Sequence, residues 1–194
     1  LNFEMVKRVA VAFLPTAAVG FFLYGFIKNV LLGNETVVLW SLLLGGVTLI
    51  AFEWWYSKTS VKINSNNSLL LSYRQSFLIG LFQAISVIPG VSRAAATILG
   101  GLWLGIPRKT IVEFSFLLAV PTMAGATGLD LMKNLSSFSA DQTGFLILGF
   151  IVSFLTAIVS IKFLIHFIQK NTLIPFGVYR IILAIAFLFF FDIK

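Results

Sequence analysis

The sequence is poor in cysteine, histidine and acidic residues. Its 194 residues include no cysteine, one histidine and seven aspartates and glutamates. Without cysteine the chain forms no disulfide and no cysteine-ligated metal site, and the redox state of its compartment is left open. Charged residues make up 11% of the chain and hydrophobic residues 59%, whereas about 25% of an average soluble domain is charged. This composition excludes an ordinary soluble domain and predicts an integral membrane protein.

The net charge of +7 does not indicate a nucleic-acid partner. The basic residues stand at the ends of apolar runs, which is the pattern that orients membrane helices, and no nucleic-acid-binding motif is present. The first apolar run is too long for a cleavable signal peptide and lacks a small-residue cleavage site. The chain is therefore expected to contact membrane lipids and no nucleic acid.

Five apolar stretches predict transmembrane helices. They cover residues 9–30, 37–56, 111–131, 143–167 and 173–191. Pro15 predicts a kink in the first stretch, and Glu53, near the end of the second, is expected at the level of the lipid headgroups. No change of composition divides the chain, so residues 1–194 form one predicted transmembrane domain. The predicted fold class is an all-α integral membrane protein with about five spans and one re-entrant helix–loop–helix.

The re-entrant element is residues 76–107, an apolar stretch that is interrupted in its middle. Pro89 removes a helical N–H and Gly90 permits unusual backbone angles, so one straight helix is not expected here. Residues 76–88 and 93–106 would form helices of roughly 20 Å each, too short for a hydrocarbon core of about 30 Å. The chain is therefore expected to enter and leave on one side, with its irregular backbone in a polar cavity.

The middle of the re-entrant element predicts an anion site. Ser92 is a natural N-cap for the second half-helix, whose first N–H groups and positive dipole end would face the cavity. Arg93 adds a forked cationic donor that suits phosphate, and Thr97 lies one turn further on. Gly90, Ser92, Arg93 and Thr97 are the predicted substrate-binding residues, and Arg93 and Ser92 the predicted catalytic ones. The alternative is that Ser92 only caps the helix while Arg93 extends to the headgroups.

The same residues resemble the signature of a known family. Gln83, Pro89-Gly90-Val91-Ser92-Arg93 and Ala96-Thr97-Ile98 resemble the P-G-x-S-R-S-G-A-T-I motif of the BacA/UppP undecaprenyl-diphosphatases. Further matches are Tyr73-Arg74-Gln75, Glu113-Phe114-Ser115-Phe116-Leu117-Leu118-Ala119-Val120-Pro121, and Pro175-Phe176 with Tyr179-Arg180. The resemblance thus runs through nearly the whole chain. Ala94 and Ala95 depart from the usual Ser and Gly, which changes one hydroxyl and one backbone position of the expected pocket.

The resemblance implies an enzyme of the bacterial plasma membrane that hydrolyses undecaprenyl diphosphate to undecaprenyl phosphate and inorganic phosphate. That reaction recycles the isoprenoid carrier of peptidoglycan and cell-wall glycan synthesis, and the family is linked to bacitracin resistance. The resemblance also implies Mg²⁺ or Ca²⁺ as an aid and an inverted-repeat architecture, while an oligomer is left open. Leu14-Pro15-Thr16-Ala17-Ala18 and Val120-Pro121-Thr122-Met123-Ala124 form a weak internal echo in keeping with a repeat.

One part of the family pattern has no counterpart in this sequence. The family begins with a membrane segment that carries an acidic motif and a Ser-Ser-x-Gly-His motif, and this segment supplies catalytic Glu, Ser and His residues. Nothing here resembles it, so we expect the chain to be the C-terminal part of a longer protein, or a truncated one. On this expectation the chain alone lacks part of the active site.

Three further residues are candidate site residues. Gln83 belongs to the signature. Glu113 is expected in the first turn of the third span, where it either favours the helix dipole or pairs with Arg93 or a cation. Arg180 lies several residues into the fifth span and either snorkels inward or neutralises substrate charge. No protein metal-ligand set is predicted, and Asp130 and His166 are expected near the membrane interfaces.

The basic residues predict an orientation in the membrane. If the re-entrant element returns to its starting side, one face carries Lys7, Arg8, Lys58, Lys62, Arg74, Arg108, Lys109, Lys162 and Lys170, and the other carries Lys28, Lys133 and Lys194. The positive-inside rule makes the first face cytoplasmic, which places Leu1 inside and Lys194 outside. A full span through residues 76–107 would move Arg108 and Lys109 to the other face and remove the asymmetry.

Two other functions are considered. A membrane transporter or flippase for a lipid phosphate or another anion would use a broken helix equally well, and it would move lipid phosphate without releasing inorganic phosphate. An enzyme of the phosphatidic-acid-phosphatase type needs two catalytic histidines in set motifs, and His166 is the only histidine. The second of these functions is therefore not expected.

Overall fold

The computed structural model describes residues 3–59, 71–134 and 143–190. These residues form helices and their connections, without a β-strand in the described part, which confirms the all-α fold class. In chain order the elements are α1 (Phe3–Phe22), α2 (Tyr24–Phe26), the π-helical turn η1 (Ile27–Leu31), α3 (Glu35–Lys58), α4 (Tyr73–Ala84), the 3₁₀ turn η2 (Ile85–Val87), α5 (Arg93–Trp103), α6 (Arg108–Asn134), α7 (Thr143–Lys170) and α8 (Ile174–Phe190).

Four of the described helices, α1, α3, α6 and α7, are long and apolar enough to cross a membrane. The first predicted span extended to Val30, and the structure instead ends α1 at Phe22 and continues through α2 and η1 to Leu31. The fifth predicted span corresponds to α8, which has 17 residues and a length of about 26 Å. Its predicted last residue, Phe191, lies outside the described residues.

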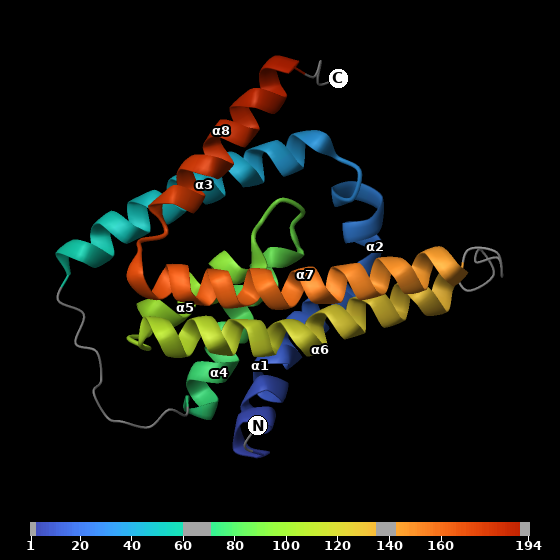
Figure 1. Cartoon of the computed structure of the whole chain (residues 1–194), viewed down its shortest axis with the longest axis horizontal. Helices are drawn as coiled ribbons and strands as arrows, with labels where there is room; N and C mark the ends of the chain where they lie inside the picture. The colour runs from blue at the N-terminus through green and yellow to red at the C-terminus, as the bar shows by residue number, and fades with distance from the viewer. Residues whose placement is uncertain (1–2, 60–70, 135–142, 191–194) are drawn as a thin grey trace.

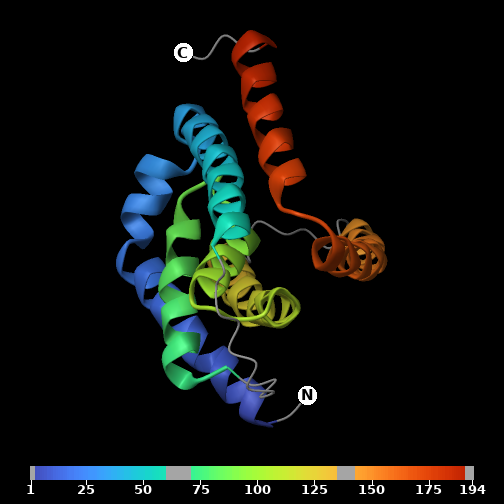
Figure 2. The ribbon, with the colours of Figure 1, turned by 90° about the vertical axis from the view of Figure 1, so that its left-hand side faces the viewer.

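Four helices form the centre of the molecule. α1 packs on α4, α4 on α5, α5 on α6, and α6 returns to α1, so these four close a ring (Figure 1). α3 and α8 pack side by side on the outside of the ring, while α7 contacts α6 (Figure 2). None of the most apolar part of α7 is buried, which suits a helix in contact with lipid.

The predicted interruption of residues 76–107 is confirmed. α4 ends at Ala84, earlier than the predicted Ile88, and α5 runs from the predicted Arg93 to Trp103. With 12 and 11 residues, the two arms are about 18 and 16 Å long. Phe82 of α4 packs against α5, where an added Cβ at Gly100 would come within 2.5 Å of its ring. The loop between the arms rises toward α3 (Figure 1).

A buried ion pair joins three elements at one end of the molecule. Arg108 Nη2, at the start of α6, donates to Glu53 Oε1 near the end of α3 at 2.5 Å. Glu53 Oε2 accepts from the backbone N–H of Leu173, which precedes α8, at 3.3 Å. The Glu53 side chain is only 5% exposed. It is therefore buried in the protein, whereas a position among the lipid headgroups was expected. The pair brings together the end of α3, the start of α6 and the start of α8.

Glu53→Gln is expected to lower the free energy of unfolding by about 2 kcal/mol, because the Arg108 guanidinium then loses its carboxylate in a poorly hydrated site. Breaking a wholly buried pair costs about 3–5 kcal/mol, and the 20% exposure of the Arg108 side chain reduces that penalty. The unfolding temperature of the protein in detergent micelles measures the change. Glu113→Gln is the matched control, since Glu113 is exposed and lies outside the described ion pairs. Equal unfolding temperatures for the two variants would contradict this account.

Candidate functional site

The backbone of residues 88–92, called the break from here on, adopts a conformation that its sequence requires. Pro89 has no N–H to continue the 3₁₀ turn, and Ile88 is already extended, with φ −72° and ψ 122°. Gly90 has φ +87°, in a region that residues with a side chain rarely adopt. A Cβ at Gly90 would also lie 2.7 Å from the Val38 carbonyl oxygen of α3. Gly90 is therefore needed both for the turn and for the close approach to α3.

The N-terminus of α5 leaves backbone donors available beside the break. Ser92 is the N-cap, as predicted, and its Oγ accepts from the Ala95 N–H at 3.2 Å. The Ala96 N–H donates to the Ser92 carbonyl. The N–H groups of Arg93 and Ala94 have no acceptor among the described residues. These two groups and the positive end of the helix dipole favour an anion at this position.

Arg93 is held toward α6. Its Nη1 donates to the Ala119 carbonyl at 3.2 Å, and the residue is partly exposed. A guanidinium has five N–H donors, and the described residues provide an acceptor for one of them. Glu113, considered as a partner for Arg93, is exposed and lies outside the described ion pairs. Nor is Glu113 in the first turn of its helix, because α6 begins at Arg108, earlier than predicted.

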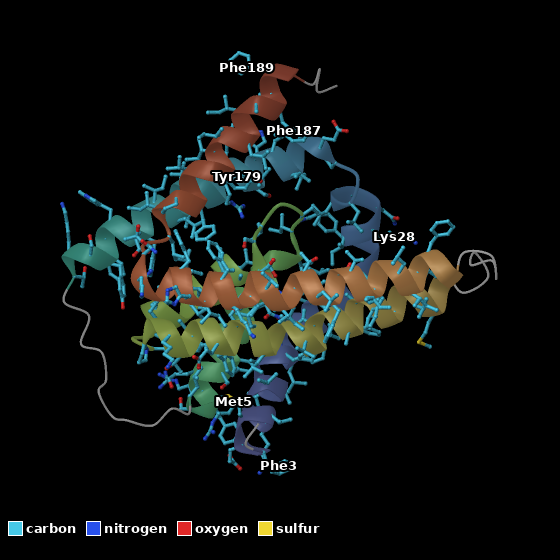
Figure 3. All side chains as sticks on the ribbon, in the orientation of Figure 1. Phe3, Met5, Lys28, Tyr179, Phe187 and Phe189 are labelled. Atoms are coloured by element: carbon cyan, nitrogen blue, oxygen red, sulfur yellow. The ribbon has the colours of Figure 1, made fainter. Side chains whose placement is uncertain are left out.

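Arg180 approaches the break from α8. Its Nη2 donates to the Gly90 carbonyl at 2.6 Å and to the Ser41 carbonyl at 3.1 Å. The residue is 9% exposed, and its Nε is buried without a hydrogen-bond partner among the described residues. Gly45 makes room for it, since a Cβ there would lie 2.6 Å from Nη2. Tyr179, the preceding residue, is exposed on the outer face of α8 (Figure 3), so Arg180 points inward, and its contact with substrate stays a prediction.

A cavity of about 590 Å³ lies between α3, α8 and the two arms. Its wall is mostly apolar and includes Leu44, Phe82 and Trp103. Ser92 and Arg180 lie in the same wall. Among the described lining residues there is no carboxylate and no imidazole. The cavity thus combines an apolar interior with two polar side chains, Ser92 of the break and Arg180 of α8.

Thr97 and Gln83 lie away from this cavity. The Thr97 hydroxyl is buried between α5 and α6, where it is 2.5 Å from the Ser115 hydroxyl and 3.0 Å from the Arg93 carbonyl. Gln83 is fully buried and donates to Thr16 Oγ1 at 3.1 Å and Thr122 Oγ1 at 3.0 Å. The structure therefore gives both residues contacts within the protein, and direct contact of Thr97 with substrate stays a prediction.

The described residues offer no cluster of protein ligands for a divalent cation. They contain no group of three or more His, Asp or Glu side chains that could hold a metal. Glu53 is paired with Arg108, and Asp130 and His166 are exposed on α6 and α7. No step of the chemistry below is therefore assigned to Mg²⁺ or Ca²⁺, which stays an untested prediction.

One family model and three relatives show what this chain is similar to. The family model of the bacitracin resistance protein BacA matches residues 1–186. An undecaprenyl-diphosphatase of Aquifex aeolicus is 46% identical over 190 residues, which cover 98% of this chain and 73% of the relative. One from a Sulfurihydrogenibium species is 46% identical over 187 residues, covering 96% and 73%. One from Campylobacter jejuni is 42% identical over 185 residues, covering 95% and 68%.

Gly90→Ala is expected to lower the free energy of unfolding by at least about 2 kcal/mol, through the positive φ and the contact with α3. Thermal unfolding in detergent checks this value. Gly149→Ala is the matched control, because a Cβ at that position meets nothing within 4 Å. The control should be neutral or slightly stabilising, since alanine favours the helix. A Gly90→Ala protein as stable as this control would mean that the break does not need glycine.

Proposed function

The chain belongs to the BacA family, and we propose that it hydrolyses undecaprenyl diphosphate to undecaprenyl phosphate and inorganic phosphate. The observation that carries the proposal is the arrangement beside the break, where the first turn of α5 has two N–H groups without an acceptor among the described residues and also carries the Arg93 guanidinium. The product is the monophosphate carrier that cell-wall glycan synthesis uses.

The site supplies the donors that a diphosphate needs. Phosphate oxygens accept hydrogen bonds from helix N-termini and from forked guanidinium groups, both of which bring positive charge. The N–H groups of Arg93 and Ala94 would bind one phosphate oxygen each. The Ser92 hydroxyl already accepts from Ala95, so its proton remains available for a further phosphate oxygen.

In the net reaction, the oxygen of a water molecule bonds to the terminal phosphorus, the bond between that phosphorus and the bridging oxygen breaks, and the proton lost by the water passes to solvent or to a phosphate oxygen. The electron pair of the broken bond moves to the bridging oxygen, which becomes a terminal oxygen of the lipid monophosphate. Negative charge on the transferred group and the leaving phosphate grows during this step, and donors fixed in advance stabilise it. Arg93, Ser92 and the N-terminus of α5 would thus bind the substrate and stabilise charge rather than transfer protons.

The apolar cavity suits the part of the lipid next to the phosphates. Ser92 and Arg180 share its wall with Leu44, Phe82 and Trp103, so one molecule with a charged head and an apolar chain would match both kinds of surface. The isoprenoid units nearest the diphosphate would lie against these side chains. The rest of the chain would extend into lipid.

The protein is a multi-pass membrane protein, and we propose that its N-terminal end is cytoplasmic. Arg108 at the start of α6 is paired with Glu53 near the end of α3. The Tyr73 hydroxyl at the start of α4 donates to Glu4 near the start of α1. Lys28 lies far from Phe3 and Met5 (Figure 3). These contacts suit a face rich in basic residues and a face poor in them, as the positive-inside rule requires.

Arg93→Ala is expected to lower phosphate release by roughly 10²–10³-fold, because one preformed charge-stabilising donor is lost. Release of inorganic phosphate from undecaprenyl diphosphate by the full-length protein in detergent measures it. Arg74→Ala is the matched control at an exposed arginine of α4 and should retain normal turnover. Unchanged turnover in Arg93→Ala would remove Arg93 from the mechanism. Movement of lipid phosphate across proteoliposomes without phosphate release would instead favour a transporter.

Single cysteines at positions 74, 109 and 28 test the orientation, and the chain has no native cysteine to interfere. All three wild-type residues, Arg74, Lys109 and Lys28, are exposed. If α4 and α5 form a re-entrant pair, a membrane-impermeant maleimide should label positions 74 and 109 from the cytoplasmic side and position 28 from the other. Labelling of positions 74 and 109 from opposite sides would show that residues 76–107 cross the membrane.

A further inference from the structure

The Gln83 carboxamide lies between two helices of the central ring. Its Nε2 donates to Thr16 Oγ1 of α1 at 3.1 Å and to Thr122 Oγ1 of α6 at 3.0 Å. Each of these threonines follows a proline within its helix, Pro15 and Pro121. Gln83 itself is fully buried, one residue before the end of α4. A single side chain of the re-entrant element thus connects α4 to both neighbours.

The hydrogen bonds around Gln83 allow only one orientation of its amide. The Thr16 hydroxyl donates to the Gly80 carbonyl at 3.1 Å, and the Thr122 hydroxyl donates to the Leu118 carbonyl at 2.7 Å. Both hydroxyl protons are used, so each oxygen can only accept from Gln83. Gln83 Oε1 is consequently buried without a hydrogen-bond partner in the described part of the chain. A buried acceptor of this kind is destabilising, which favours a role for Gln83 other than stability alone.

One turn of α6 receives a hydrogen bond from each arm of the re-entrant element. Gln83, on the first arm, donates to Thr122, and Arg93, on the second arm, donates to the carbonyl of Ala119. Pro121 lies between these two acceptors and removes one backbone hydrogen bond from the helix. The position of this turn therefore depends on its side-chain contacts more than that of a regular turn does.

We propose that Gln83 is a positioning residue for Arg93 and acts through the 118–122 turn of α6. This inference rests on the proposed function. The Gln83–Thr122 bond fixes the turn, the turn fixes the Ala119 carbonyl, and that carbonyl holds one end of the Arg93 guanidinium. The bond to Thr16 holds α1 and has no such connection to Arg93. Loss of the Gln83–Thr122 bond should therefore affect Arg93 and catalysis, whereas loss of the Gln83–Thr16 bond should affect only the packing of α1.

Thr122→Val and Thr16→Val separate these consequences, because valine keeps the shape of threonine and removes the hydroxyl. Thr122→Val should lower kcat about tenfold or more with KM nearly unchanged, since a small misplacement of a group that acts in the transition state affects turnover. Thr16→Val should lower the unfolding temperature and leave kcat within about threefold. Gln83→Met, which removes both donors, should combine the two effects. Phosphate release and thermal unfolding are measured on the same preparations of full-length protein.

Thr156→Val is the matched control. The Thr156 hydroxyl donates to the carbonyl four residues earlier at 2.8 Å, as that of Thr122 does at 2.7 Å, but Thr156 is exposed on α7. Its variant should have wild-type kcat and stability. Folded Thr122→Val with wild-type kcat would overturn the proposal, and so would equal losses of kcat in Thr122→Val and Thr16→Val.

A double-mutant cycle identifies the group through which Gln83 acts. In an Arg93→Lys background the further loss caused by Thr122→Val should shrink to less than about twofold, because a residue that acts through Arg93 has no separate effect once Arg93 is changed. Full additivity would overturn the link to Arg93. Failure of the proposed function is a separate outcome, because it would appear as no release of inorganic phosphate from undecaprenyl diphosphate by the wild-type full-length protein.

Discussion

A helix that is interrupted inside a membrane leaves backbone N–H and C=O groups without partners, and lipid cannot supply them. This constraint governs the arrangement of the centre of the molecule. At Gly90 the break contacts α3 and receives a hydrogen bond from α8. The Gly90 carbonyl accepts from Arg180, while Arg93 donates to Ala119 on the other side. The N–H groups of Arg93 and Ala94 have no acceptor among the described residues, and these are the groups that the substrate would use.

The guanidinium groups of Arg93 and Arg180 are stabilised in different ways. Charged side chains within a membrane are costly and are usually paired with other groups or with backbone carbonyls. The Nη2 of Arg180 donates to two backbone carbonyls, those of Ser41 and Gly90. Arg93 makes one such bond among the described residues and is partly exposed. The structure thus separates an arginine that supports the backbone from one that can exchange partners with a ligand.

The sequence predicted the local features of this arrangement and missed those that depend on distant contacts. Proline next to glycine located the break, and the Ser92 cap and Arg93 start of α5 followed from ordinary helix-capping preferences. The pairing of Glu53 with Arg108 joins residues 55 positions apart, and Arg180 reaches Gly90 over 90 positions. The spacing of apolar residues along the sequence does not indicate contacts between residues so far apart. The start of α6 was also missed, because polar residues that precede an apolar run can still belong to its helix.

The length of α6 has a mechanical consequence. Its 27 residues extend for about 40 Å, whereas the hydrocarbon layer is about 30 Å thick, so the helix must tilt or leave the layer at its ends. The turn that holds Arg93 belongs to this same helix. Bilayer thickness therefore acts on the angle at which the guanidinium meets a phosphate, and short-chain and long-chain lipids would present the enzyme with different site geometries.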